Sequence, residues 1–197
     1  MKQNKTFLEI ENSIKSIALS AIVNPVQNHK LGRNILMVNL SGTHNSILIY
    51  DETKGMSEIG TMRYTIRGGK VFVSEFEVHE EFQGLGIGRT MFEFALAHGD
   101  AMGATYVYGY AKPTNNVKGV SVQGKNMFKE EQKAIMEVYK KLGCSFDNPQ
   151  NEGTIDKIFE QRWLTGEKTG NVSEEIKPIL MQVVQRDKKQ SMGWSKG

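Results

Sequence analysis

One seven-residue segment, Gln83–Arg89 (Gln-Gly-Leu-Gly-Ile-Gly-Arg), constrains the fold of this chain more than any other part of the sequence. It follows an apolar run from Val71 to Val78 that is typical of a strand, and it precedes a run from Thr90 to Met102 with helical spacing. A glycine-rich turn between a strand and a helix leaves backbone N–H groups free at the start of the helix, where anions bind. The segment therefore predicts a site for a phosphate-bearing ligand.

The spacing of the glycines excludes two common phosphate-binding motifs. The dinucleotide fingerprint needs G-x-G-x-x-G, whereas Gly84, Gly86 and Gly88 read G-x-G-x-G and Arg89 stands at the place of the third glycine. A P-loop needs Gly followed by Lys and then Ser or Thr, and the chain contains no such tripeptide. The remaining pattern is Gln-x-x-Gly-x-Gly. The alternative is a turn whose glycines serve only the backbone geometry.

Length and charge favour one ordinary domain and give no sign of nucleic acid. The chain has 197 residues and a net charge of +3, with its Lys and Arg residues spread along the sequence. The single cysteine, Cys144, cannot form an internal disulfide. No apolar run is long enough to span a membrane, and Met1 to Thr6 is polar. We therefore expect a cytoplasmic protein without a membrane segment.

Periodicity predicts a helix followed by an antiparallel meander. The pattern from Thr6 to Glu9 is a capping box, and apolar residues then continue at helical spacing, which predicts a helix over about 7–22. We expect Pro25 to end it, and we expect strands at Ile35 to Leu40, Ser46 to Tyr50, Glu58 to Ile66 and Val71 to Val78. The Gly68-Gly69 pair between the last two is a strong hairpin signal.

After the glycine segment the pattern alternates between helices and strands. Helices are expected at Thr90 to Met102 and at about Lys129 to Leu142, the second with Ile135, Val138, Tyr139 and Leu142 on one face. Strands are expected at Ala104 to Ala111, Cys144 to Phe146 and Ile158 to Trp163. Alternation along the first of these strands places Tyr106, Tyr108 and Tyr110 on one face.

The C-terminal part has a different composition. We interpret Leu164 to Val172 as a linker, and we expect a regular helix from Pro178 whose apolar stripe packs against the chain's own domain. Residues from Arg186 to Gly197 are polar and are expected to fray. The predicted organisation is a single domain over 1–165, with its core at about 35–163, and a helical extension with a polar tail over 166–197.

The order of these elements around Gln83, Gly86 and Gly88 resembles the GNAT superfamily of N-acetyltransferases. A second, separate similarity lies at Ala134 to Gly143, which carries the family's pattern of Ala, Tyr and Leu-Gly. The resemblance implies an α/β (α+β) fold with a mixed, mostly antiparallel central sheet, splayed middle strands and flanking helices. It also implies acetyl-CoA as acyl-donor substrate and no metal.

The resemblance supplies an expectation for each matching position. The residues expected to hold acetyl-CoA are Phe76, Glu77, Val78, Gln83, Gly84, Leu85, Gly86, Ile87, Gly88, Arg89, Thr90, Asn116 and Tyr139. Backbone N–H groups of the glycine segment would bind the pyrophosphate, with a charge-assisted contact from Arg89. The main chain near Val78 would polarise the thioester carbonyl.

Three side chains are candidates for the chemistry. The resemblance implies that Tyr139 protonates the departing thiolate, and the alternative is a core-facing residue of its helix. Strand alternation places Glu75 and Glu77 together on the face opposite Phe76 and Val78. Either glutamate could act as general base or as substrate clamp, because an amine acceptor must lose a proton before it attacks. The alternative is a solvated strand face.

Two departures from the family pattern limit what can be transferred. Cys144 stands where the family usually has an aromatic residue, and an extra segment from Pro113 to Phe128 separates Asn115 and Asn116 from the next helix. The acceptor is therefore an unidentified amine, on a small molecule or a protein. A catalytically silent module that binds acyl-CoA, an enzyme acting on RNA or a base, and a homodimer remain alternatives. The four histidines lack metal-ligand spacing.

Overall fold

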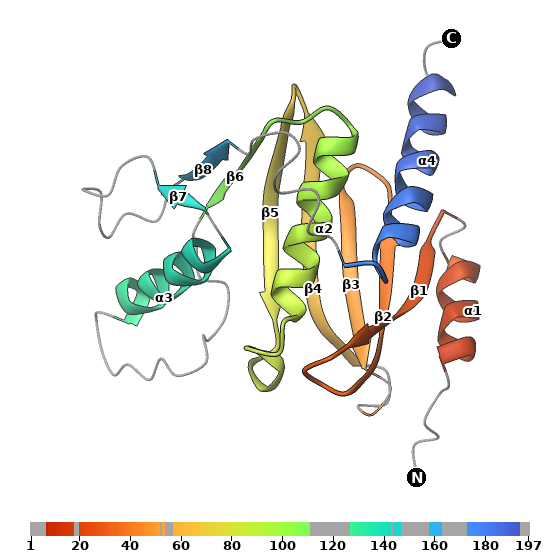
Figure 1. Ribbon diagram of the computed structural model, residues 1–197, viewed down its shortest axis with the longest axis horizontal. Helices are drawn as coiled ribbons and strands as arrows, with labels where there is room; N and C mark the ends of the chain where they lie inside the picture. Colours follow the sequence, from red (N-terminus) through yellow and green to blue (C-terminus); the bar gives the residue numbers. More distant parts are fainter. Residues whose placement is uncertain are drawn as a thin grey trace.

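The computed structural model describes residues 7–17, 20–51, 53, 57–110, 127–142, 144–146, 158–162 and 173–193. They form one eight-stranded sheet in the order β1-β2-β3-β4-β5-β6-β8-β7, flanked by helices (Figure 1). Neighbouring strands run antiparallel except β5 and β6, which are parallel. The predicted mixed, mostly antiparallel sheet with flanking helices is confirmed.

The central meander lies where the alternation of apolar residues predicted it. Strands β2 (Arg33–Leu40), β3 (Asn45–Asp51), β4 (Ser57–Arg67) and β5 (Lys70–Val78) agree with the prediction to within two residues. The turn between β4 and β5 contains Gly68 and Gly69, whose φ angles of 55° and 71° lie in the left-handed region. Two consecutive glycines are suited to this conformation, because a β-carbon would be strained there.

The middle of the sheet is splayed. The pairs between β5 and β6 (Tyr106–Tyr110) run from Lys70 with Tyr106 to Val73 with Gly109. On the other side of β5, the register with β4 shifts between Arg63, which faces Glu75, and Tyr64, which faces Val73. Such a β-bulge bends a strand and re-aims its side chains. The second half of β5 therefore continues beyond its pairing with β6, as expected.

The N-terminal prediction was wrong at its end. Helix α1 (Phe7–Ile17) stops before residue 22, and Ile22 instead begins a strand, β1 (Ile22–Asn28). Pro25 does not terminate a helix, because it lies inside β1 opposite Leu36. β1 is at the edge of the sheet and pairs with β2 alone. Proline has no backbone N–H to donate, and an edge strand tolerates this loss because it has only one neighbouring strand.

The two faces of the sheet carry different helices. Helix α2 (Ile87–Ala101) packs on β4 and β5, and Met91 and Phe94 are fully buried there beside Met62 and Val71. On the opposite face, α1 contributes Ile14 to a smaller cluster with Leu36 and Val38. The main core therefore lies between the sheet and α2.

Helix α3 (Met127–Lys141) follows the predicted pattern with one exception. Ile135, Tyr139 and Leu142 pack against the main core as expected, but Val138 is 41% exposed and does not share their face. The short strands β7 (Ser145–Phe146) and β8 (Ile158–Arg162) complete the edge beyond β6.

The C-terminal helix α4 (Lys177–Gly193) is part of the main core. Its predicted apolar stripe is buried at Ile176, Ile179 and Val183, and the helix contacts α2 and β1 (Figure 1). The expected fraying from Arg186 was wrong, because the helix continues to Gly193. The predicted linker and the boundary at residue 165 lie outside the described residues. Within the described residues, no helix is long and apolar enough to cross a membrane.

Candidate functional site

The glycine segment forms an open loop between β5 and α2, separated from the strand by a short 3-10 helix, η2 (Glu80–Phe82). Gly84 and Gly86 have φ angles of 80° and 85°, which L side chains rarely adopt, and Gly86 is the N-cap of α2. The first backbone N–H with a helix-type partner is that of Thr90, which donates to the Gly86 carbonyl at 3.0 Å. The N–H groups before it belong to the helix terminus that favours anions.

The third glycine has a different role. A β-carbon on Gly88 would lie 3.1 Å from Phe76 Cζ and 3.5 Å from Val78 Cγ2. The first turn of α2 therefore sits directly on the end of β5, and a larger side chain would push the two apart. Gly84 and Gly86 allow the shape of the loop, whereas Gly88 allows its close approach to the strand.

Two polar side chains of the loop have partners within the protein. Gln83 Nε2 donates to the Val78 carbonyl at 2.9 Å and so fastens the start of the loop to the end of β5. Arg89 Nη2 donates to the Lys141 carbonyl at 3.3 Å, at the end of α3, and Arg89 Nη1 lies 3.9 Å from Glu93 Oε1. Arg89 thus bridges α2 and α3 beside the loop, and its side chain is 61% exposed.

Tyr139 is buried on the inner face of β5. Its ring lies 5.8 Å from that of Phe76 and 6.1 Å from that of Phe92, measured between centroids. Burial raises the pKa of the Tyr139 phenol, and the nearby Cys144 raises it further. The phenol therefore keeps its proton throughout the neutral range. This environment suits a proton donor and equally suits the core-facing alternative.

The two glutamates of β5 lie on the outer face, as alternation predicted. Glu75 is paired with Arg63, whose Nη1 lies 3.1 Å from Glu75 Oε2, while Glu77 stands opposite Thr61 in the register. Phe76 and Val78 point the other way, into the packing against α2. The candidate bases, Glu75 and Glu77, therefore lie on the outer face of β5, whereas the candidate acid, Tyr139 of α3, packs against its inner face.

Sequence reasoning missed Glu58, which belongs to the same acidic group. Burial raises the pKa of Glu58; His79 and Arg63 oppose the shift, while Glu75 and Glu77 add to it. Glu58 stands opposite Tyr50 near the start of β4, inside a run that had been interpreted only as a strand. Its proximity to Glu75 and Glu77 depends on strand register, which the local sequence does not reveal.

Part of the predicted site lies outside the described residues, namely Asn116 and most of the segment from Pro113 to Phe128. Of the three tyrosines of β6, the side chain of Tyr108 is described. Its ring lies 5.0 Å from that of Phe72, and Lys70 Nζ is 5.7 Å from its centroid. In the part of the chain that the structure describes, no group of three or more His, Cys, Asp or Glu residues could hold a metal ion.

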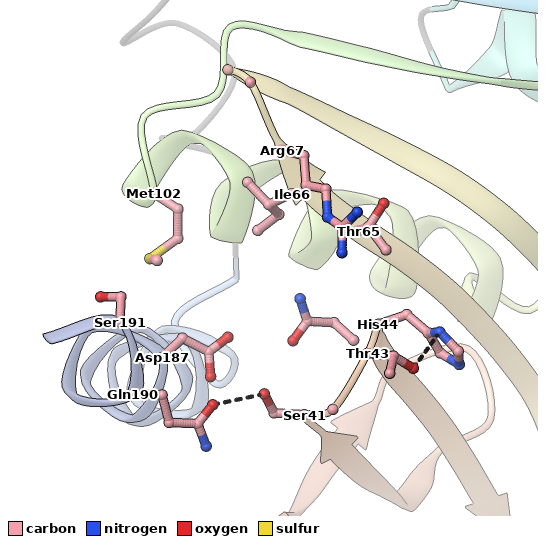
Figure 2. Close-up of a pocket in the computed structure, with 14 residues that line it drawn as sticks. Ser41, Thr43, His44, Thr65, Ile66, Arg67, Met102, Asp187, Gln190 and Ser191 are labelled. Carbon is pink, nitrogen blue, oxygen red and sulfur yellow. Dashed lines mark hydrogen bonds between the residues drawn. The ribbon is translucent and has the colours of Figure 1, made fainter. Parts of the chain in front are cut away.

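A pocket opens at the other end of the sheet, between the β2–β3 turn, the β4–β5 turn and α4 (Figure 2). Ser41 donates to Gln190 Oε1 at 3.2 Å across it, and Asp187 lines it from α4. Since the glycine loop follows the far end of β5, whereas the Gly68-Gly69 turn precedes the strand, the pocket and the loop are separated by the length of β5.

A buried polar network, which we call the clasp, lies behind this pocket and consists of Asn39, Tyr64, His98, Arg186 and Asp187. Tyr64 Oη lies 2.8 Å from His98 Nδ1, and His98 Nε2 lies 3.2 Å from Asp187 Oδ2. Arg186 Nη2 donates to Asn39 Oδ1 at 2.8 Å. His98 and Asn39 are fully buried. The clasp thus joins α4 to α2, β2 and β4.

The comparisons with known proteins agree with this architecture. Residues 29–119 match the model of the acetyltransferase (GNAT) family. The match contains the glycine loop, Glu75 and Glu77, and ends before Tyr139. No curated protein sequence matches the chain.

Among solved structures, the chain is similar to the E234A mutant of a cAMP-binding acyltransferase from Mycobacterium smegmatis, with a TM-score of 0.57 and 13% identity over 93% of this chain. It also matches the PaiA N-acetyltransferase from Thermoplasma acidophilum, solved with coenzyme A, with a TM-score of 0.43 and 15% identity over 60% of this chain. The chain spans 61% and 60% of the length of these two proteins. At 13% identity the likeness to the cAMP-binding acyltransferase concerns the fold alone.

Proposed function

Since residues 29–119 match the model of the GNAT acetyltransferase family, we propose that this protein is an N-acetyltransferase that transfers an acetyl group from acetyl-CoA to an amine. The observation that carries the proposal is the glycine loop, with Gly84 and Gly86 in the left-handed region, at the N-terminus of α2 and one short 3-10 helix after the splayed half of β5. The N-terminus of α2, where anions are favoured, thus lies near the part of β5 that β6 does not pair with. A donor with a pyrophosphate and a long thioester arm needs both.

The donor would lie along the splayed half of β5. The N–H groups of Leu85 to Arg89 would hold its pyrophosphate, because they gather at the positive end of the α2 dipole. The thioester would then reach the strand near Val78. Fixed backbone donors there would stabilise the charge that develops on the carbonyl oxygen during attack.

The acceptor would approach from the outer face of the sheet. An amine of lysine type is protonated at neutral pH, with a pKa of roughly 10.4, so a carboxylate or a water bound to one must remove its proton. Glu75 and Glu77 are the candidates for this role, because both lie on the outer face beside the splayed half of β5. The amine nitrogen attacks the thioester carbon, the carbon–sulfur bond breaks, and CoA leaves as the thiolate.

Tyr139 would donate a proton to this leaving group from the inner face. Its raised pKa keeps the phenol protonated at neutral pH, so the phenol would donate a hydrogen bond to the developing thiolate. Full proton transfer to a thiolate, whose own pKa is roughly 8.5, is uphill from such a phenol. The contribution of Tyr139 is therefore greatest while negative charge builds on sulfur.

Thermal unfolding with ligands tests the donor site. Acetyl-CoA and CoA should both raise the unfolding midpoint, and NAD should not, because a ligand that binds only the folded state stabilises it by mass action. Release of free CoA thiol on addition of the right amine would then establish turnover. If neither acetyl-CoA nor CoA shifts the midpoint, the proposal is wrong.

The ion pair between Arg63 and Glu75, together with the deep burial of Tyr139, favours a second candidate: an acyl-CoA-binding module without turnover. In such a module both catalytic candidates would be structural. It predicts the same thermal shift with acetyl-CoA but no thiol release across a broad panel of amines. Thiol release with any single amine would exclude it.

A further inference from the structure

The turn between β1 and β2 lies beside the glycine loop, although more than fifty residues separate the two in sequence (Figure 1). Asn28, the last residue of β1, is 8% exposed. Its Nδ2 donates to the Leu85 carbonyl at 3.1 Å, and its Oδ1 accepts from the backbone N–H groups of Lys30 and Leu31, each at 3.0 Å. One side chain thus shapes its own turn and holds the loop.

Lys30 makes the second contact. Its Nζ donates to the Gly84 carbonyl at 3.1 Å, and its Cδ is 3.9 Å from the place of a β-carbon on Gly86. The side chain therefore lies along the loop with its charge at the loop's first peptide. Lys30 is exposed, so this contact lies at the surface of the protein.

The two contacts hold successive carbonyl groups on the same side. In a planar trans peptide the C=O of one residue points opposite to the N–H of the next. With the Gly84 and Leu85 carbonyl groups turned toward Lys30 and Asn28, the N–H groups of Leu85 and Gly86 face away from the β1–β2 turn. Successive N–H groups that point the same way form an anion-binding concavity.

We propose that Asn28 and Lys30 are positioning residues of the donor site, which fix the glycine loop in its anion-binding shape before the pyrophosphate arrives. The inference rests on the proposed function. The left-handed angles at Gly84 and Gly86 leave the loop free to adopt other shapes, because glycine is permissive on both sides of φ = 0. Two donors from a neighbouring hairpin remove that freedom, so less ordering remains for the ligand to impose.

The test compares ligands with and without phosphates. Affinities of CoA and of pantetheine, which lacks every phosphate, are measured by calorimetry or by competition for the wild type and for Asn28→Ala and Lys30→Met. We expect the affinity for CoA to fall about tenfold in Asn28→Ala and about threefold in Lys30→Met. The affinity for pantetheine should stay unchanged in both variants. Lys30→Arg should restore most of the loss, because it keeps a cationic donor.

Gln27→Ala is the matched control, since Gln27 is the exposed neighbour of Asn28 on the same strand. Asn28 is buried, so thermal unfolding accompanies each titration, and Lys30→Met serves where Asn28→Ala does not fold. Equal losses for CoA and pantetheine, or no loss for either variant, would overturn the positioning role. A wild type that binds CoA in that case leaves the proposed function intact, whereas a wild type that does not bind CoA refutes the proposed function itself.

Discussion

The two ends of the central sheet use their polar groups in opposite ways. At the loop end, Gly84 and Gly86 shape a backbone in which the N–H groups of Leu85 and Gly86 face away from the β1–β2 turn. At the other end, the clasp pairs its side chains with one another, and His98 is fully buried. We therefore expect the loop end to serve ligand binding and the clasp end to serve stability. Substitutions at the two ends should have separable effects.

The largest expected effect is the loss of stability in Arg186→Met. Arg186 donates to the Ser20 carbonyl and to the carbonyl and Oδ1 of Asn39, and it contacts Asp187. Its removal therefore leaves these acceptors without their donor and takes one partner from Asp187, which keeps its contact with His98. Breaking a buried ion pair on one side costs about 3–5 kcal/mol. Urea unfolding should show this loss, and Lys188→Met, at the exposed neighbouring position, should not.

CoA affinity sharpens this first prediction. Under conditions in which Arg186→Met remains folded, CoA should bind as tightly as to the wild type, because the clasp does not touch the loop. A fall in CoA affinity that accompanies the loss of stability would show that the two ends are coupled, and the contrast between them would not hold.

The next effect concerns two buried tyrosines, one at each end. Tyr139→Phe should lower kcat about 10²-fold with little change in stability, because it removes the proposed proton donor but keeps the ring packed on Phe76 and Phe92. Tyr64→Phe should lower the free energy of unfolding by about 1 kcal/mol through the lost contact with His98 and leave kcat unchanged. Thiol-release kinetics and urea unfolding measure both variants. Wild-type turnover in Tyr139→Phe would favour the core-facing alternative.

The sequence predicted the elements that local rules govern and missed those that depend on distant partners. The meander and the Gly68-Gly69 turn follow from alternation and from glycine at left-handed angles. Strand β1 was missed because Pro25 usually breaks regular structure, and only its edge position makes it acceptable. The charge of Arg186 indicated solvent, whereas Asn39, 147 residues away, accepts its hydrogen bond inside the fold.

The candidate site divides in the same way. The glycine loop and the shared face of Glu75 and Glu77 were predictable, because both depend on residues adjacent in sequence. Glu58 and Asn28 reach the site only through strand register and hairpin packing, so no local motif marks them. The prediction for Val138 was wrong for a related reason, because an apolar side chain at helical spacing need not face the core.

A third prediction compares glycines with the same strain. Gly86→Ala and Gly68→Ala each place a β-carbon at positive φ, at 85° and 55°, and neither new atom meets another heavy atom closer than 3.9 Å. Each should therefore cost about 1–2 kcal/mol of stability. Gly86→Ala alone should also lower the affinity for CoA, because relief of the strain would rotate the peptide groups of the loop and change where their N–H groups point. Equal CoA affinity in both variants would mean that the left-handed angle at Gly86 does not serve the ligand.

The smallest expected effect is a difference between the two ends in how acid lowers their stability. Each end has one carboxylate with a lowered pKa. Burial opposes ionisation of Asp187, but hydrogen bonds from His98 and Arg186 outweigh it, so its pKa is lowered. Asp51 lies beside Arg33 at the loop end of β3. Burial raises its pKa, but hydrogen bonds from Arg33 and Thr53 outweigh this effect, so the pKa of Asp51 is also lowered. A carboxylate with a lowered pKa in the folded state contributes stability that is complete above its unfolded value, roughly 3.9, and is lost as the pH falls through its folded value.

The free energy of unfolding of the wild type should therefore decline as the pH is lowered below about 4. Asp187→Asn and Asp51→Asn should each lower stability at neutral pH and make the decline shallower, because one group no longer takes up a proton on unfolding. Hydrogen exchange at low pH would identify the end that opens first. We expect α4, because its clasp depends on Asp187, whereas β3 is held on both sides by neighbouring strands. Earlier exchange in β3 would place the weaker end at the loop and reverse the comparison.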